Sequence, residues 1–208
     1  MRLLAAALHA LLVALYPVAV YIGLTRGSVR AVGLALVGLL GLTILLRVRG
    51  QRREHLWPLI RVPLSTAGVL ALAAALDDAR LMLALPVLVS LLLLWHFGSS
   101  LATTPLVERF ARMQKETLSP DQRRYCRTVT VVWCIFFVVN AAIAGALALW
   151  APVAWWAMYT GLIAYGLIGL LGTTEYLVRK YRFREYGRGL HDRLLARLMP
   201  PPAGEGVP

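Results

Sequence analysis

Few residues of this 208-residue chain could do chemistry, and most of those lie inside long apolar stretches. His9, His96 and Glu175 are ionisable groups in such stretches, where a charge is costly and is therefore a functional candidate. Brought together, the three could relay a proton or hold a polar headgroup. Kept apart, each would bond locally, and we favour this interpretation because Arg179 follows Glu175 by one helical turn.

Asn140 and the neighbouring pair Glu108 and Arg109 complete the set of polar candidates. Asn140 lies near the middle of an apolar stretch, where an amide more often clamps helices together than binds a ligand. Glu108 and Arg109 could touch a phosphate, but an exposed charge on an interfacial helix explains them better. Asp77 and Asp78 are expected to form a turn that caps the next helix.

No enzyme signature accompanies these residues in the sequence. There is no Ser/His/Asp set, no glycine-rich phosphate loop and no metal-ligand spacing. The two cysteines, Cys126 and Cys134, match no metal cluster and do not favour a disulfide. We therefore expect a non-catalytic protein without a metal or cofactor. The alternative is an intramembrane acyl or headgroup transferase that uses His9, His96 and Glu175, and a proton-coupled transporter ranks last.

The apolar stretches that must position these side chains indicate an integral membrane protein. Apolar residues make up 59% of the chain and charged residues 15%, against about 45–50% and 25% in soluble proteins. We expect an all-α, polytopic transmembrane helical bundle within residues 1–184, followed by a cytoplasmic basic tail, 185–208. Six spans are favoured, five if the third is re-entrant and four if the third and fourth form a hairpin that does not cross. The expected spans are 3–24, 29–46, 62–76, 81–98, 128–150 and 154–178.

The distribution of basic residues supports six spans with both termini in the cytoplasm. In that topology, 19 of the 22 Lys and Arg residues fall on the cytoplasmic side, as the positive-inside rule requires. Only Arg26, Arg30 and Arg80 fall outside. The net charge of +12 then indicates contact with anionic lipids of the bilayer and gives no support to nucleic-acid binding.

The loop between the fourth and fifth expected spans predicts an amphipathic helix in the membrane interface. Leu106, Phe110 and Met113 recur at helical spacing after Thr104-Pro105, while Glu108 and its charged neighbours take other faces. A second short helix is expected to begin at Ser119-Pro120-Asp121 and to run into the fifth span.

Four segments of the C-terminal half carry recognisable motifs. They are PLVERFAR (105–112), YCRTVTVVWC followed by FFVVN (125–140), WAMYTGLIAY (156–165) and EYLVR (175–179). Over roughly residues 85–182, the chain resembles a family of bacterial inner-membrane proteins encoded with aryl-polyene and xanthomonadin-type pigment genes.

The resemblance implies a setting and no catalytic residues. Proteins encoded nearby in such clusters include acyl carrier proteins, an acyltransferase and lipid exporters. The expected function is therefore a multi-pass accessory protein of pigment-lipid biosynthesis or trafficking in the inner (cytoplasmic) membrane. It would dock the acyl carrier protein or acyltransferase, or help to move the lipid product. Basic cytoplasmic loops would suit an acidic carrier protein.

Overall fold

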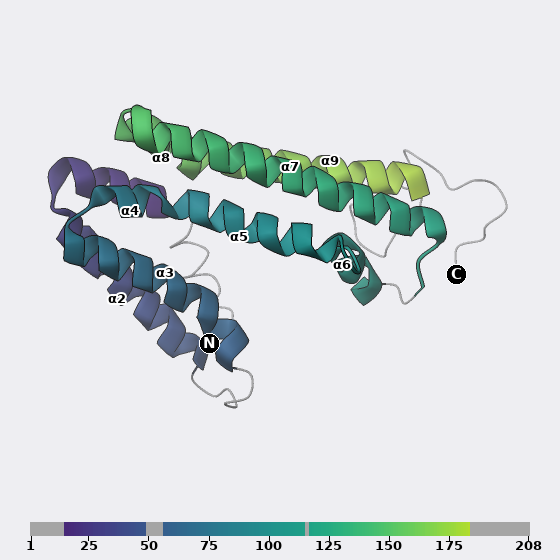
Figure 1. The fold of residues 1–208 in the computed structure, drawn as a ribbon, viewed down its shortest axis with the longest axis horizontal. Helices are drawn as coiled ribbons and strands as arrows, with labels where there is room; N and C mark the ends of the chain where they lie inside the picture. The colour runs from purple at the N-terminus through teal and green to yellow at the C-terminus, as the bar shows by residue number, and fades with distance from the viewer. Residues whose placement is uncertain (1–14, 49–55, 115–116, 184–208) are drawn as a thin grey trace, which may run out of the picture. The chain divides into compact units, whose positions relative to one another are not determined.

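The structure, a computed structural model, describes residues 15–48, 56–114 and 117–183. His9 and the expected tail 185–208 lie outside these residues. Throughout the described residues the regular structure is helical, as expected (Figure 1). In chain order, residues 15–26 form the first helix, followed by α2 (Val29–Val48), α3 (Leu56–Leu76), α4 (Ala79–Leu83), α5 (Leu85–Ser100), α6 (Leu106–Gln114), α7 (Pro120–Trp150), α8 (Val153–Met158), the π-helix η2 (Tyr159–Ile163) and α9 (Ala164–Phe183).

Three stretches in the described part of the chain are long and apolar enough to cross a membrane. They are Ala79–Ser100, Pro120–Trp150 and Val153–Phe183, and each contains one of the expected spans. Two shorter apolar helices, Val29–Leu45 and Thr66–Leu76, coincide with the second and third expected spans. The helical membrane-protein class is therefore supported, while the count of six spans and the orientation stay predictions.

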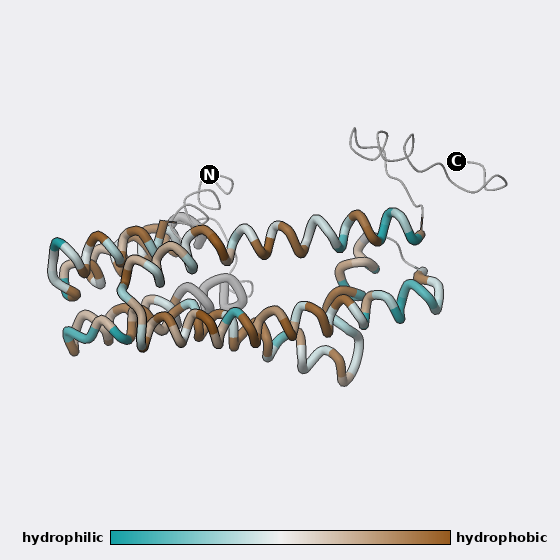
Figure 2. Tube along the Cα trace, turned by 90° about the horizontal axis from the view of Figure 1, so that it is seen from above, coloured by the Kyte–Doolittle hydropathy of each residue, from teal (hydrophilic) through white to brown (hydrophobic). Residues whose placement is uncertain are grey.

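The chain divides into two compact units. Unit 1 consists of residues 1–96 and 133–164, and unit 2 of residues 97–132 and 165–208. Hydrophobic residues run along the helices, and hydrophilic residues gather at the start of α7 and the end of α9, both in unit 2 (Figure 2). Many large apolar side chains of α5 in unit 1, including Leu88, Val89 and Leu91, are exposed, as expected for a helix surrounded by lipid.

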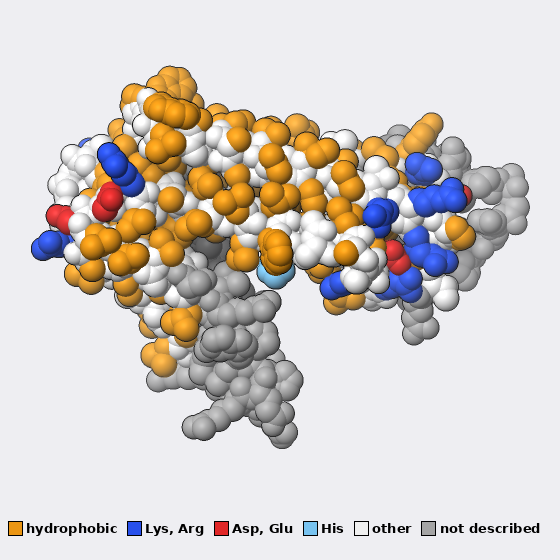
Figure 3. Space-filling view, in the orientation of Figure 1, with side chains coloured by type: hydrophobic (Ala, Val, Ile, Leu, Met, Phe, Trp, Pro, Cys, Tyr) orange, Lys and Arg blue, Asp and Glu red, His pale blue; other side chains and the backbone are white. Residues whose placement is uncertain are grey.

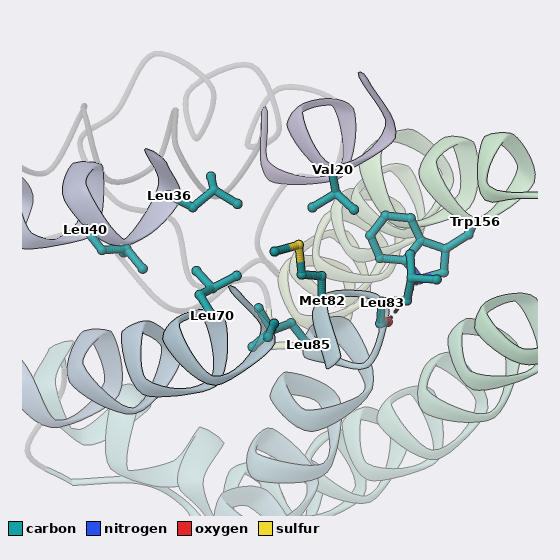
Figure 4. Close-up of a cluster of buried hydrophobic side chains, with 9 residues drawn as sticks. Val20, Leu36, Leu40, Leu70, Met82, Leu83, Leu85 and Trp156 are labelled. Carbon is teal, nitrogen blue, oxygen red and sulfur yellow. Dashed lines mark hydrogen bonds between the residues drawn. The ribbon is translucent and has the colours of Figure 1, made fainter. Parts of the chain in front are cut away.

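The core of unit 1 joins the first helix, α2, α3, α4 and α8. Leu36 and Leu40 of α2 lie against Leu70 of α3, and Val20 and Met82 lie on the other side of the cluster (Figure 4). Trp156 of α8 completes this cluster and is fully buried.

α2 and α3 approach closely at Gly33. A β-carbon built on Gly33 would lie 2.7 Å from the β-carbon of Ala74 and 3.1 Å from the carbonyl oxygen of Leu70. The first distance is shorter than real β-carbons show and the second is unusually tight, so glycine is what allows this contact between the two helices.

The expected fourth span is not one uninterrupted helix, because α4 ends and α5 begins around Ala84. Pro86 has no backbone N–H, so the carbonyl of Met82, four residues earlier, loses its helical donor. The Tyr16 hydroxyl donates to this carbonyl at 2.6 Å instead. The Trp156 indole N–H donates to the carbonyl of Leu83 at 3.1 Å (Figure 4). Side chains from two other helices therefore donate hydrogen bonds to the backbone carbonyls at the break.

The turn before α4 confirms the expected capping role of the two aspartates. Asp78 is the N-cap of α4, and its carboxylate accepts from the backbone N–H of Arg80 at 2.8 Å. Asp77 adopts a left-handed backbone conformation (φ 53°), which aspartate tolerates better than most residues. Its carboxylate lies 3.9 Å from Arg30.

Gly33→Ala should lower the thermal unfolding midpoint, because the added methyl group would push α2 and α3 apart at a cost of about 1–3 kcal/mol. Gly38→Ala, in the same helix, is the matched control, since a β-carbon there meets nothing within 4 Å among the described residues. Circular dichroism melts of both variants in one detergent measure the difference. Equal midpoints would contradict the close contact.

Tyr16→Phe should destabilise the fold by about 1–3 kcal/mol, because it removes the side-chain hydrogen bond to the Met82 carbonyl. The same change should cost clearly less in a Pro86→Ala background, where the restored backbone N–H at position 86 can donate to that carbonyl. A double-mutant cycle of melting free energies measures this coupling. Strictly additive effects would mean that Tyr16 does not compensate for the proline.

Candidate functional site

Asn140 is buried in unit 1 and holds three helices together. Its side-chain nitrogen donates to the Ser90 hydroxyl of α5 at 2.9 Å, and its side-chain oxygen accepts from the Tyr159 hydroxyl of η2 at 3.0 Å. Ser90 in turn donates to the backbone carbonyl of Pro86 at 2.8 Å. Every hydrogen bond of this set stays within the protein, which agrees with the helix-clamping role expected for Asn140.

The π-helix η2, which positions Tyr159, was not foreseen from the sequence. It divides the expected sixth span into α8 and α9, and Tyr159 is its first residue. Gly161, in the same turn, lies close to the first helix: a β-carbon there would be 3.3 Å from Pro17. A π-turn has no simple sequence signature, so only the assembled helices reveal it.

Of the three ionisable candidates, the structure describes His96 and Glu175. His96 lies on α5 in unit 1 and is exposed, and Glu175 lies on α9 in unit 2. Because His9 lies outside the described residues, the expected grouping of the three side chains stays a prediction.

Glu175 forms the expected pair with Arg179 on α9. Its carboxylate oxygen Oε1 lies 3.5 Å from Nε of Arg179. The backbone carbonyl of Glu175 also accepts from the Tyr125 hydroxyl of α7 at 3.1 Å. The Tyr125 ring packs edge-on against Phe183 at 5.4 Å, and the Arg182 guanidinium lies 5.9 Å from the Tyr125 ring centroid. The end of α9 is thereby joined to the start of α7.

The expectation for Glu108 was wrong: its side chain is not an exposed charge. It is only 8% exposed, and its Oε1 accepts from both Nε and Nη2 of Arg112, at 3.0 and 2.7 Å. Arg109 points elsewhere and donates to the Thr104 carbonyl and the Thr103 hydroxyl. Glu108 and Arg109 have different partners because adjacent residues on a helix face different directions, whereas residues four apart share a face.

α7 begins with a reciprocal capping box. The Ser119 hydroxyl accepts from the backbone N–H of Gln122 at 3.2 Å, and the Gln122 side chain accepts from the backbone N–H of Ser119 at 2.9 Å. The helix then continues without a break from Pro120 to Trp150, which confirms the expected start and its continuation into the fifth span. The glutamine three residues after Ser119 was the signal for the full box, and sequence reasoning missed it.

The described residues of unit 2 carry a strongly basic surface, which we call the basic end. Its Lys and Arg side chains gather around α6, the start of α7 and the end of α9 (Figure 3). The described residues of unit 2 contain eight basic and three acidic residues, and two of the acidic residues, Glu108 and Glu175, form ion pairs with arginines. The basic residues are Arg109, Arg112, Arg123, Arg124, Arg127, Arg179, Lys180 and Arg182.

Inside the basic end, Cys126 is a buried thiol within electrostatic range of Glu108, Glu175 and Arg179. The described residues contain no group of three or more His, Cys, Asp or Glu side chains that could hold a metal ion. What this part of the molecule presents outward is positive charge, mostly on guanidinium groups, which favour carboxylate and phosphate partners.

Asn140→Leu should lower the thermal stability by about 1 kcal/mol, the size of membrane interhelical hydrogen bonds. Val139→Leu, one residue earlier on the exposed side of α7, should leave it unchanged. Melting curves measured by size-exclusion chromatography after heating compare the two variants. A stable Asn140→Leu protein that had lost only a cellular activity would argue for ligand binding in place of clamping.

No family model, no curated protein and no solved structure matches this chain. The functional conclusion therefore depends on the residues of this chain.

Proposed function

We propose that this chain is a non-catalytic accessory protein of the bacterial inner membrane whose basic end docks an acidic acyl carrier protein. It would cross the membrane six times with both termini in the cytoplasm, and it would serve the synthesis or placement of an aryl-polyene-type pigment lipid. The pigment setting comes from the resemblance of residues 85–182, and the docking role from the geometry of the basic end.

The observation that carries the proposal is the length of α7 relative to a bilayer. α7 has 31 residues and is therefore roughly 46 Å long, whereas the hydrocarbon core is about 30 Å thick. The excess at the N-terminal end contains Arg123, Arg124 and Arg127, all exposed. The start of α7 would thus extend beyond the hydrocarbon as a positively charged helical projection.

Contacts within unit 2 make this projection a defined surface. The Tyr125 contacts with Glu175 and Phe183 join it to the end of α9, which adds Lys180 and Arg182. The Arg127 guanidinium donates to the Leu101 carbonyl at 2.9 Å, which joins it to the loop after α5. A surface that is already ordered loses less entropy when it binds a partner.

The charge of the projection supports a cytoplasmic position and an acidic partner. Basic residues next to spans are retained in the cytoplasm, where acyl carrier proteins are found. Carrier proteins are acidic, so complementary charge would speed their encounter with the basic end and make it dependent on salt.

The experiment is a binding measurement on the full chain in lipid nanodiscs with the purified acyl carrier protein of the same pigment system. Binding should weaken as salt rises, and Arg123→Gln/Arg124→Gln should weaken it about tenfold, or about 1.4 kcal/mol. Neutral glutamine is preferred because reversed charges could change the topology.

Arg26→Gln/Arg80→Gln is the matched control, since it removes two exposed charges from helix ends in unit 1. This variant should bind the carrier as tightly as the unchanged protein. Equal weakening in both variants would show unspecific attraction, and no binding in any variant would reject the docking role. A co-purified polyene lipid without bound carrier would instead favour transport of, or catalysis on, the lipid.

A further inference from the structure

α6 turns its apolar side chains outward, away from its own chain. Phe110 is 56% exposed and Met113 is 82% exposed, whereas Glu108 on the other side of the helix is buried. Arg109 is also exposed and lies beside the two apolar residues. The outward face, defined as Arg109, Phe110 and Met113, therefore combines large apolar groups with positive charge, the composition of helices that lie in a lipid interface.

Hydrogen bonds hold the start of α6 to the end of α5. The backbone N–H of Leu106 donates to the Ser100 hydroxyl at 2.9 Å, and Ser100 is the last residue of α5. Arg109 also bonds back to the connecting loop, at Thr103 and Thr104. If Ala79–Ser100 crosses the bilayer, the first turn of α6 must lie where that span leaves the hydrocarbon.

We infer that the outward face of α6 is a binding surface for anionic lipid, with Phe110 and Met113 inserted at the acyl boundary and Arg109 beside headgroup phosphates. A water-exposed position would leave two large apolar side chains solvated, directly beside the membrane surface. The charge of Arg112 is paired with the Glu108 carboxylate, whereas Arg109 donates to the neutral oxygens of Thr103 and Thr104 and keeps its net positive charge for a headgroup phosphate. With Ala79–Ser100 crossing the bilayer, the attachment to Ser100 also holds this face beside the membrane surface.

This inference depends on one part of the proposed function, the crossing of the bilayer by Ala79–Ser100, and on nothing concerning carrier proteins. The docking surface consists of Arg123 and Arg124 on α7, whereas the lipid surface consists of the outward face of α6. The experiment must therefore report the depth of α6 and the depth of α5 separately.

The test places a nitroxide spin label at one position at a time, in the full chain in nanodiscs of phosphatidylcholine and phosphatidylglycerol. The three labelled variants are Met113→Cys on α6, Val89→Cys on α5 and Asp121→Cys at the start of α7, in a Cys126→Ala/Cys134→Ala background. Accessibility to oxygen, which dissolves in lipid, is compared with accessibility to a water-soluble nickel chelate. Labels at 113 and 89 should favour oxygen, and the label at 121 should favour nickel.

The controls separate failure of this inference from failure of the proposed topology. A label at 113 that favours nickel, while the label at 89 favours oxygen, would overturn the lipid contact and leave the span intact. Nickel access at both positions would overturn both proposals. A label at 113 protected from both reagents would also overturn the inference, because the face would then be covered by protein.

The preference for anionic lipid is tested by native mass spectrometry of the protein released from these nanodiscs. The unchanged chain should retain phosphatidylglycerol over phosphatidylcholine, and Arg109→Gln should reduce this enrichment at least twofold. Arg26→Gln, at an exposed position in unit 1, is the control and should retain the enrichment. Equal lipid retention in all three proteins would overturn the assignment of Arg109.

Discussion

Unit 1 depends on the hydrogen bonds that side chains donate to the backbone carbonyls at the break between α4 and α5. Pro86 removes the N–H that would bond to the Met82 carbonyl, and an unpaired carbonyl in hydrocarbon costs several kcal/mol, in the range of about 2–7. Tyr16 and Trp156 donate to the carbonyls of Met82 and Leu83. Their rings also lie edge to face, with centroids 6.4 Å apart. The same two side chains therefore donate hydrogen bonds to the carbonyls at the break and pack the first helix against α8.

Other buried polar groups are likewise committed to the fold. Asn140 is bonded to Ser90 and Tyr159, and Glu108 is paired with Arg112. In a low-dielectric interior, such groups are stable only with partners, and each set here finds its partners within the chain. Among the exposed groups of unit 2 are the arginines at the start of α7 and the side chains of Phe110 and Met113 on α6. The two proposals concern these surfaces.

The basic end shows how local and tertiary constraints act on the same residues. Its arginines stand next to predicted spans, and in the proposed topology their charge would help to orient the chain in the membrane. Tertiary contacts through Tyr125 then hold the ends of α7 and α9 together. The same charges thus form an ordered surface, which the proposed acidic partner would recognise without further folding.

The sequence by itself determined the features that arise within a few residues of one another. Apolar stretches predicted the helices, and the Asp78 cap, the start of α7 at Ser119 and the Glu175–Arg179 pair all involve residues at most four positions apart. Only the tertiary structure decided which polar groups meet across helices. Tyr16 bonds to a carbonyl 66 residues away, and Asn140 to a hydroxyl 50 residues away. Burial of Glu108 likewise required knowing which side of α6 faces the protein, because an amphipathic pattern shows two faces and does not say which one lipid covers.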